Sequence, residues 1–356
     1  MFKERIEKLR NSMISKKLDC VFIMGDPNRN YLSGFTGDES FSIITMDKAF
    51  FITDSRFTQQ AKEQVKEYEV VEYMGNFPEF FTDIIKRLNV KNVGFEEDVV
   101  SYDYYQKLSK NLEAKLVPME GIIEEIRLIK DKNEVEVIRK AAGIADKAFD
   151  HMLNFIKVGM SERKVGLELE FTMKKLGATD LSFPSIVASG LRSSLPHGQA
   201  TNKTLNNGDF LTLDFGCIFK EYCSDMTRTV VIGEPNDKMI DVYNTVLEAQ
   251  QRALKVIKAG IRAGVVDYAA RDYITEKGYG EYFGHSVGHG VGREIHEMPR
   301  VGPKSEIVLK QGMIITDEPG IYIPDFGGVR IEDLILVTDS GSDVLSSSPK
   351  DLICLK

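Results

Sequence analysis

Two aspartates in one segment are spaced so that a β-hairpin would bring them together. The segment "GDFLTLDFGCIFKEYCSDMTRTVVIG" has two strand-like arms, with "IFKE" at the bend. If the turn is centred between Phe219 and Lys220, Asp214 lies directly opposite Asp225. Opposed hairpin residues have Cβ atoms about 5 Å apart, where like charges destabilise the sheet. The predicted hairpin therefore presents two carboxylates that need a compensating group.

A second segment repeats this arrangement closer to the C-terminus. In "MIITDEPGIYIPDFGGVRIEDLILV", strand-like arms flank a Pro-Asp-Phe-Gly-Gly turn, and Glu318 and Glu332 are equidistant from Asp325. A β-bulge in either hairpin would shift the register by one residue and separate its pair. Without a bulge, the second hairpin also opposes two carboxylates.

Four carboxylates among apolar residues need positive charge nearby, because an unpaired buried carboxylate is costly or takes up a proton. Two divalent cations would balance four negative charges, and oxygen-rich ligands favour Mn²⁺, Co²⁺ or Mg²⁺ over a purely structural zinc. The alternative is that these acids are surface charges, or pair with Arg228 and Arg330. The repetition of the acid pair favours the metal site.

Three of the five histidines lie between the two hairpins, in "YFGHSVGHGVGREIHE". His285 and His289 have the spacing of helical zinc ligands, but no Glu follows either of them. The glycines disfavour a helix, at about 1 kcal/mol each relative to Ala. The segment is therefore predicted to be a loop that offers one or more imidazoles to the site. His197, in "SSLPHGQATN", lies in a second such loop.

The composition limits the classes of partner. The net charge is −8 and the pI about 5.4, and no stripe of Lys and Arg is present, which argues against nucleic acid. The apolar runs are too short for a membrane span, and "MFKERIEKLRNSMISKK" lacks the apolar region of a secretory signal. The four cysteines have no CxxC spacing, so we expect reduced thiols in a cytoplasmic protein.

The first third of the chain alternates strand-like and helix-like segments, which predicts a small mixed α/β domain. The longest helical pattern follows and is interrupted at "IKDKNE", where Asp131 and Glu134 have the spacing of a helix-start capping box. The second domain combines helices with strand-rich hairpins, and "NYLSGFTGDES" in the first domain, about residues 30–40, is predicted to be a mobile loop.

In order along the chain, "LDFGCIFKEYCSDMTRT", "GHGVGREIHE", "DEPGIY" and "GVRIED" closely resemble the metal-site motifs of the prolidase and aminopeptidase P family. These proteins are metallopeptidases with the pita-bread fold, and the resemblance covers nearly the whole chain. It implies an α+β protein, with a creatinase-type α/β N-terminal domain at residues 1–122 and a pita-bread catalytic domain at residues 123–356.

The resemblance also implies a ligand set for two metal ions. Asp225 and Glu332 would bridge the ions, Asp214 would bind one, and His289 with Glu318 would bind the other. The expected metals are Mn²⁺ or Co²⁺, with Zn²⁺ as an alternative. A pseudo-twofold relation between the halves of the catalytic domain would explain why the two hairpins are alike.

The implied reaction is hydrolysis of an Xaa-Pro bond by a hydroxide shared between the two cations. Glu318 is expected to accept the proton of the water and pass it to the proline nitrogen. His296 and His197 match histidines that contact substrate in the family, and His296 is expected to stabilise the oxyanion. His285 is expected to lie outside the ligand set, where it would support the site or the fold.

Two arginines are candidates for the carboxylate of a dipeptide substrate. They are Arg330 and, as the weaker candidate, Arg293, which stands where relatives often carry an aliphatic residue. Asp317 is another departure from the family pattern, and it is expected to point away from the ions.

The leading hypothesis is a homodimeric Xaa-Pro dipeptidase. Aminopeptidase P, which removes the first residue of longer Xaa-Pro peptides, is the alternative within the same chemistry. A methionine aminopeptidase would not need the N-terminal domain, and creatinase is disfavoured because all five ligand positions are filled. An alternative from another class of protein is a non-catalytic peptide-binding scaffold of this fold, although no metal-binding residue is missing.

Overall fold

The computed structural model describes residues 1–356 and divides into two compact units, Met1–Arg127 and Leu128–Lys356. The sequence placed the boundary after residue 122, whereas the structure keeps the short helix that follows in the first unit. The first unit has the helices α1 (Phe2–Lys16), α2 (Asp26–Ser33), α3 (Thr58–Gln64), α4 (Phe77–Leu88), α5 (Tyr102–Ser109) and α6 (Ile122–Arg127), and the strands β1 (Cys20–Ile23), β2 (Ser40–Thr45), β3 (Ala49–Thr53), β4 (Glu69–Glu72), β5 (Asn92–Phe95) and β6 (Lys115–Pro118).

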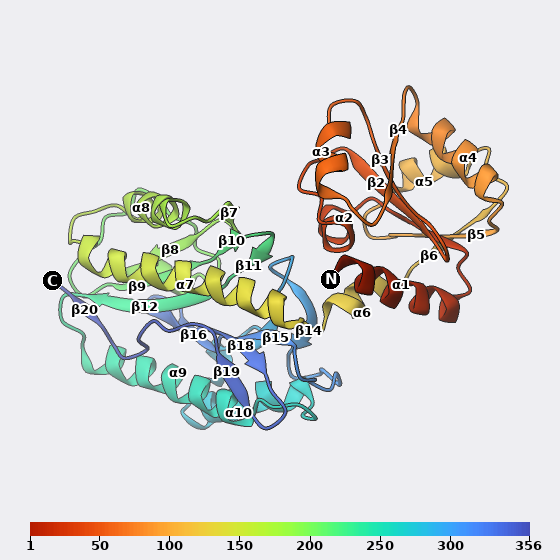
Figure 1. The fold of residues 1–356 in the computed structure, drawn as a ribbon. Helices are drawn as coiled ribbons and strands as arrows, with labels where there is room; N and C mark the ends of the chain where they lie inside the picture. The colour runs from red at the N-terminus through yellow and green to blue at the C-terminus, as the bar shows by residue number, and fades with distance from the viewer. The chain divides into compact units, whose positions relative to one another are not determined.

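The first unit is a six-stranded sheet with helices packed on both faces (Figure 1). The strand order is β4-β3-β2-β1-β5-β6, and only the β1–β2 and β2–β3 pairs are antiparallel. Successive side chains of a strand point to opposite faces. Val21 and Ile23 accordingly pack with α1 and α6, while Cys20 and Phe22 pack with α4 and α5.

The prediction of a loop at residues 30–40 is wrong for residues 30–33. Residues 30–33 form the last turn of helix α2, and their side chains are buried. Pro27 in the first turn and Gly34, which ends the helix with a φ of 79°, delimit a helix too short to give a recognisable periodicity. Only residues 34–39 are irregular.

The second unit has two helix pairs that lie on opposite sides of its strands (Figure 1). Its helices are α7 (Lys132–Phe155), α8 (Glu162–Lys175), η1 (Gly190–Ser194), α9 (Asp237–Val256), α10 (Ala263–Glu276) and η2 (Gly280–Tyr282). Its strands are β7 (Asp180–Leu181), β8 (Ile186–Ser189), β9 (Phe210–Phe215), β10 (Cys217–Phe219), β11 (Tyr222–Cys223), β12 (Met226–Ile232), β13 (Gly288–Gly290), β14 (Glu297–Val301), β15 (Ile314–Asp317), β16 (Gly320–Ile323), β17 (Gly327–Arg330), β18 (Asp333–Val337), β19 (Ser342–Val344) and β20 (Cys354–Leu355).

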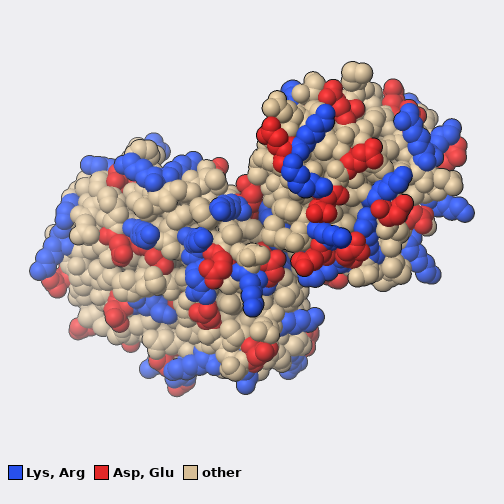
Figure 2. All heavy atoms as spheres, viewed as in Figure 1, with Lys and Arg blue, Asp and Glu red and all other residues tan.

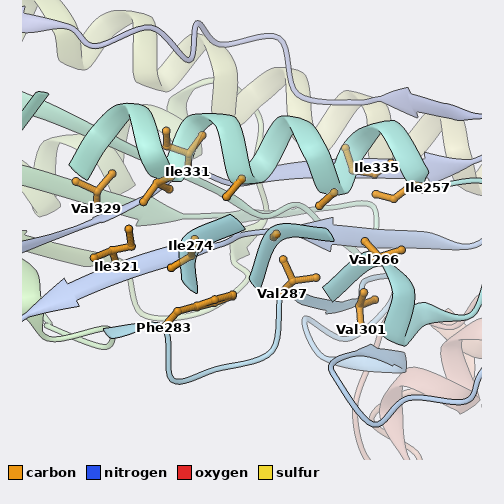
Figure 3. Close-up of a cluster of buried hydrophobic side chains, with 14 of the residues drawn as sticks. Ile257, Val266, Ile274, Phe283, Val287, Val301, Ile321, Val329, Ile331 and Ile335 are labelled. Atoms are coloured by element: carbon orange, nitrogen blue, oxygen red, sulfur yellow. The ribbon is translucent and has the colours of Figure 1, made fainter. Parts of the chain in front are cut away.

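Each helix pair of the second unit covers its own face of the strands. Helices α7 and α8 pack against β8, β9 and β12, while α9 and α10 pack against β15 to β18. Figure 3 shows the second of these cores, with Ile321 and Val329 of the β16–β17 hairpin among its side chains. The first hairpin therefore packs mainly under α7 and α8, with Phe210 and Val231 on its other face, and the second hairpin packs under α9 and α10.

The start of α7 agrees with the sequence. The Asp131 side chain accepts from the backbone N–H groups of Asn133 and Glu134, and the Glu134 side chain accepts from the Asp131 N–H, which completes the predicted capping box. All four cysteines are free thiols. None of the helices combines the length and apolar character that crossing a membrane requires. Figure 2 shows basic and acidic side chains interspersed on the face of each unit that is in view.

The predicted register of the first hairpin is wrong by two residues, because the turn is centred one residue further along the chain than expected. The turn lies at Lys220 and Glu221, which both have positive φ, so Asp214 pairs with Thr227 instead of Asp225. Two left-handed residues make the tight turn that matches strand twist, but Asn and Gly are its usual residues. Lys-Glu therefore gave no signal of the turn position. Asp225 falls in the gap between β11 and β12.

The register of the second hairpin is as predicted. Gly320 pairs with Arg330 in the β16–β17 ladder, and Asp317 pairs with Asp333 in the β15–β18 ladder. Both pairs are symmetric about Asp325, so Glu318 and Glu332 lie opposite each other in the gap between the two ladders. Strand pairing thus stops at Asp225, Glu318 and Glu332, whereas Asp214 lies within the β9–β12 ladder.

Hydrogen bonds join the two hairpins beside these acids. The Glu332 N–H donates to the Thr227 carbonyl over 3.1 Å. One residue pair further, the Thr229 hydroxyl donates to the Arg330 carbonyl over 3.0 Å and accepts from the Arg330 N–H over 3.2 Å. Strand β12 of the first hairpin is thereby fixed against the end of β17 in the second.

A matched pair of glycine substitutions tests the backbone arrangement of the first hairpin. A Cβ on Gly216 would lie 1.9 Å from the Ser224 carbonyl oxygen, whereas a Cβ on Gly143, within α7, meets nothing within 4 Å. We expect Gly216→Ala to lower the melting temperature because the strands must separate, at a cost of about 1–3 kcal/mol. Gly143→Ala should raise it, since Ala is favoured in a helix by about 1 kcal/mol. Equal effects of the two substitutions in calorimetry would contradict the close contact.

Candidate metal centre

His289 lies on strand β13, between strands β14 and β15, and not in the loop that the sequence predicted. The flanking glycines make this packing possible. A Cβ on Gly288 would lie 2.1 Å from the Thr316 carbonyl oxygen, and one on Gly290 would lie 2.2 Å from that of Met298. Glycine is therefore required because the neighbouring backbones approach so closely. The strand holds the imidazole against both acidic hairpins.

Side chains from three separated segments converge at this point. Asp225, His289 and Glu332 each offer a ligand atom, and these atoms lie within 4.8 Å of one another. Nε2 of His289 is 3.6 Å from Oδ2 of Asp225 and 3.4 Å from Oε1 of Glu318. The structure thus brings four of the five expected ligands into one cluster.

The imidazole of His289 indicates what the cluster holds. Its Nδ1 is 3.0 Å from the Gly290 carbonyl oxygen, which can only accept, so Nδ1 carries the hydrogen. Burial lowers the pKa of His289 to about 4, so the ring is neutral near pH 7. Nε2 then presents a lone pair toward two carboxylate oxygens. Acceptors on all sides repel one another unless protons or a cation lie among them, and a divalent metal fits this donor set.

Asp214, the fifth expected ligand, is held by an arginine. The Arg330 guanidinium donates to Oδ2 of Asp214, and the other oxygen, Oδ1, is buried without a hydrogen-bond partner. Arg228, the other arginine weighed as a partner, instead bonds Asp333 over 2.7 Å. One guanidinium offsets only one of the four clustered negative charges, so Oδ1 of Asp214 is open to a cation.

The remaining carboxylates resist ionisation when no cation is present. Burial, followed by the charges of Asp214 and Glu318, raises the pKa of Asp225 well above its ordinary value. Burial and then the Asp225 charge do the same to the pKa of Glu332. Burial raises the pKa of Glu318 to about 8, and the neighbouring Arg330 opposes that shift. These are the changes expected of anionic ligands gathered before their cations bind.

Arg330 is also connected to His285 by hydrogen bonds through Tyr322. Its Nη1 donates to the Tyr322 hydroxyl over 2.6 Å, and that hydroxyl is 2.9 Å from Nε2 of His285. Nδ1 of His285 is 2.8 Å from the Ser286 carbonyl oxygen, so Nδ1 carries the hydrogen and Nε2 accepts from Tyr322. Burial, followed by the Arg330 charge, lowers the pKa of His285 to about 4. His285 is therefore a neutral hydrogen-bond acceptor that supports Tyr322.

The expected substrate residues lie at different distances from this cluster. The His296 ring is exposed and its centroid is 4.3 Å from that of His289. His197 is exposed, and the carbonyl of the preceding Pro196 accepts from Arg330 over 3.3 Å. Arg293 lies over the Tyr222 ring, 4.4 Å from its centroid.

Asp317 is fully buried and pairs in register with Asp333. Neither of its carboxylate oxygens has a hydrogen-bond partner. Burial, followed by the Asp333 charge, raises the pKa of Asp317 well above its ordinary value. The alternation of side chains along a strand separates it from Glu318.

Three polar residues of the centre were not identified from the sequence. They are Tyr322, Thr227 and Thr316, whose hydroxyls contact Arg330, Glu332 and Glu318, respectively. A signal was available, because each lies two or four residues along a strand from a predicted ligand. Residues at those spacings share one face of a strand.

The raised pKa of Glu318 predicts how the stability of the metal-free protein depends on pH. Between about pH 7 and about pH 8 the unfolded glutamate is ionised, whereas the folded one keeps much of its proton because its pKa is about 8. The folded state then binds more protons, so stability falls as pH rises. We expect the melting temperature in chelator to fall over this range and Glu318→Gln to flatten the fall. Identical slopes for the two proteins would contradict the shift.

Two family models match the chain, and together they span most of it. The model described as metallopeptidase family M24 matches residues 136–339, which include every residue of the metal centre. The model described as the creatinase/prolidase N-terminal domain matches residues 5–129.

Individual relatives match over nearly their whole length. The chain is 42% identical to an Xaa-Pro dipeptidase of Pyrococcus furiosus, over 99% of this chain and 100% of the relative. A solved Xaa-Pro dipeptidase from Bacillus anthracis is 48% identical with a TM-score of 0.98, over 100% of both chains. An X-Pro aminopeptidase from Thermotoga maritima is 38% identical with a TM-score of 0.91, over 97% of this chain and 99% of the other. The chain therefore belongs to metallopeptidase family M24, with a creatinase/prolidase N-terminal domain and a pita-bread catalytic domain.

Proposed function

We propose that this chain is a metal-dependent Xaa-Pro dipeptidase. The observation that carries the proposal is the unprotonated Nε2 of His289, which faces carboxylate oxygens of Asp225 and Glu318 at 3.6 and 3.4 Å. This arrangement is a donor set suited to divalent cations, and the relatives that match end to end include Xaa-Pro dipeptidases. The chemistry of the site and the family assignment thus support the same reaction.

The ligand set has room for two divalent cations. Asp225 and Glu332 would bridge them, Asp214 would complete one position, and His289 with Glu318 would complete the other. Mn²⁺ and Co²⁺ suit this mixture of carboxylates and one imidazole, with Zn²⁺ as an alternative. When bound, two such ions lower the pKa of a water molecule and polarise the scissile carbonyl.

Glu318 is the proposed proton carrier. It is one of the less buried acids of the centre, and Oε1 is held by the Thr316 hydroxyl over 3.2 Å. A carboxylate in this position accepts the proton of the attacking water and returns it to the proline nitrogen as the peptide bond breaks. The nitrogen of an Xaa-Pro bond carries no hydrogen, so this proton is needed for its release as an amine.

The exposed imidazoles of His296 and His197 are the proposed substrate contacts. His296 adjoins His289, where it would donate to the developing oxyanion. Arg330 makes four hydrogen bonds within the protein, which leaves one of its five N–H groups for a ligand. Its larger role is therefore to hold Asp214, and Arg293 is the other proposed contact for a substrate carboxylate.

Aminopeptidase activity on longer peptides is the second candidate. The X-Pro aminopeptidase of Thermotoga maritima matches this chain over 97% of its length, so the fold alone does not separate the two activities. A homodimer is part of the proposal for either activity, and sedimentation equilibrium of the purified protein would test it.

We expect Mn²⁺- or Co²⁺-loaded protein to release proline from Xaa-Pro dipeptides. Chelation and Asp225→Asn should each remove this activity, because the bridging carboxylate is lost or left without cations. Asp103→Asn, at an exposed residue of the first unit, serves as the control and should retain it. Metal-loaded protein that leaves every such dipeptide intact would contradict the proposal and favour a non-catalytic scaffold.

Substrate length distinguishes the dipeptidase from the aminopeptidase. If the proposal holds, kcat/KM for Ala-Pro exceeds that for Ala-Pro-Ala, since the carboxylate of the dipeptide reaches a cationic group that the longer peptide cannot use in the same way. The two rates are compared by chromatography of the products. A higher kcat/KM for Ala-Pro-Ala would assign the chain to aminopeptidase P.

A further inference from the structure

Two buried threonine hydroxyls each contact a glutamate of the proposed ligand set. Oγ1 of Thr227 is 2.6 Å from Oε2 of Glu332, and Oγ1 of Thr316 is 3.2 Å from Oε1 of Glu318. Both threonines are 0% exposed, so no water competes for these contacts. The proposed proton transfer does not use either hydroxyl.

The direction of each hydrogen bond is fixed by a second neighbour. Nε of Arg330 donates to the Thr227 hydroxyl over 3.0 Å, and the backbone N–H of His289 donates to the Thr316 hydroxyl over 3.1 Å. A guanidinium and a backbone N–H are always donors. Each hydroxyl therefore accepts from its N–H, and toward an ionised glutamate, the form that binds a cation, it directs its only hydrogen.

Each threonine consequently connects, by hydrogen bonds, residues expected at one of the two ion positions. Thr227 joins Glu332 to Arg330, which also holds Asp214. Thr316 joins Glu318 to the backbone of His289. Asp214 and Glu332 are expected at one ion position, and Glu318 and His289 at the other. Glu332 is expected to bind both ions.

We propose that Thr227 and Thr316 are positioning residues that fix the rotation of the Glu332 and Glu318 carboxylates for cation binding. The last torsion of a glutamate side chain is broad and has no sharp intrinsic preference. A directed hydrogen bond to one named oxygen removes that freedom before a cation arrives. Outer partners of this kind typically change metal affinity by about 10–100-fold. The inference rests on the proposed ligand set and not on the proposed substrate.

Valine and serine substitutions separate the hydroxyl from the volume of the side chain. Thr227→Val and Thr316→Val keep the branched shape and remove the hydroxyl, whereas Thr227→Ser and Thr316→Ser keep the hydroxyl. Thr212→Val is the matched control. Thr212 is a buried strand residue whose hydroxyl contacts only Thr229, over 3.2 Å.

The experiment measures Mn²⁺ affinity by calorimetric titration and the visible absorption spectrum of the Co²⁺-loaded protein. We expect each Val variant to bind Mn²⁺ about tenfold more weakly or worse and to shift the Co²⁺ bands, because the glutamate ligand reorients. The Ser variants and Thr212→Val should match the wild-type protein in both measurements. The melting temperature in chelator identifies a variant that has failed to fold. For such a position, the Mn²⁺ affinity and Co²⁺ spectrum of the Ser variant decide whether the hydroxyl positions the ligand.

Several outcomes would overturn the inference. Wild-type affinity and an unchanged Co²⁺ spectrum in both Val variants would show that the hydroxyls do not position the ligands. Loss in the Ser variants as large as in the Val variants would assign the effect to packing, as would an equal loss in Thr212→Val. If the wild-type protein binds no Mn²⁺, the proposed ligand set itself is wrong. If it binds Mn²⁺ tightly but hydrolyses no dipeptide, only the proposed substrate is wrong.

Discussion

The mutual repulsion of four carboxylates in one buried place is the constraint on which the catalytic unit depends. Asp214, Asp225, Glu318 and Glu332 influence one another electrostatically, and only the Arg330 guanidinium offsets them from within the chain. Burying several charges of one sign is unfavourable unless cations or protons compensate. Burial and mutual repulsion raise the pKa values of Asp225, Glu318 and Glu332, so these three groups hold protons more strongly when no cation is present. Assembling the site therefore costs stability until protons or cations compensate the charges.

The fold withstands this repulsion by anchoring the acids on two hydrophobic cores. One hairpin packs mainly under helices α7 and α8 and the other under α9 and α10, and hydrogen bonds from Thr227 and Thr229 of β12 to Glu332 and Arg330 connect them. Strand pairing is interrupted at Asp225, Glu318 and Glu332, and Asp214 reaches them from within the β9–β12 ladder. His289 enters from a third strand through flanking glycines that allow close packing.

Much of this centre could be predicted from the sequence, because hairpin geometry relates residues that are close along the chain. The Glu318–Glu332 pair followed from the symmetric Pro-Asp-Phe-Gly-Gly turn. The partner of Asp214 was misplaced by two residues, since the left-handed Lys220 and Glu221 carry no turn signature and the turn centre was placed one residue too early. Contacts between the hairpins, such as that of Thr227 with Glu332, depend on tertiary packing, and no local pattern predicts them. Helix α2 escaped prediction for a related reason, because a helix this short takes its stability from burial and not from periodicity.

The number of protons released when metal binds tests most directly whether cations replace protons in this cluster. Calorimetric titration of metal-free protein with Mn²⁺ near pH 7, in buffers of different ionisation enthalpy, gives both the stoichiometry and the proton count. Since the pKa of Glu318 is about 8 in the metal-free site and those of Asp225 and Glu332 are also raised, we expect two Mn²⁺ per chain and at least one proton released. Binding of fewer than two ions, or binding without proton release, would contradict the view that this site is a cluster of carboxylates compensated by two cations.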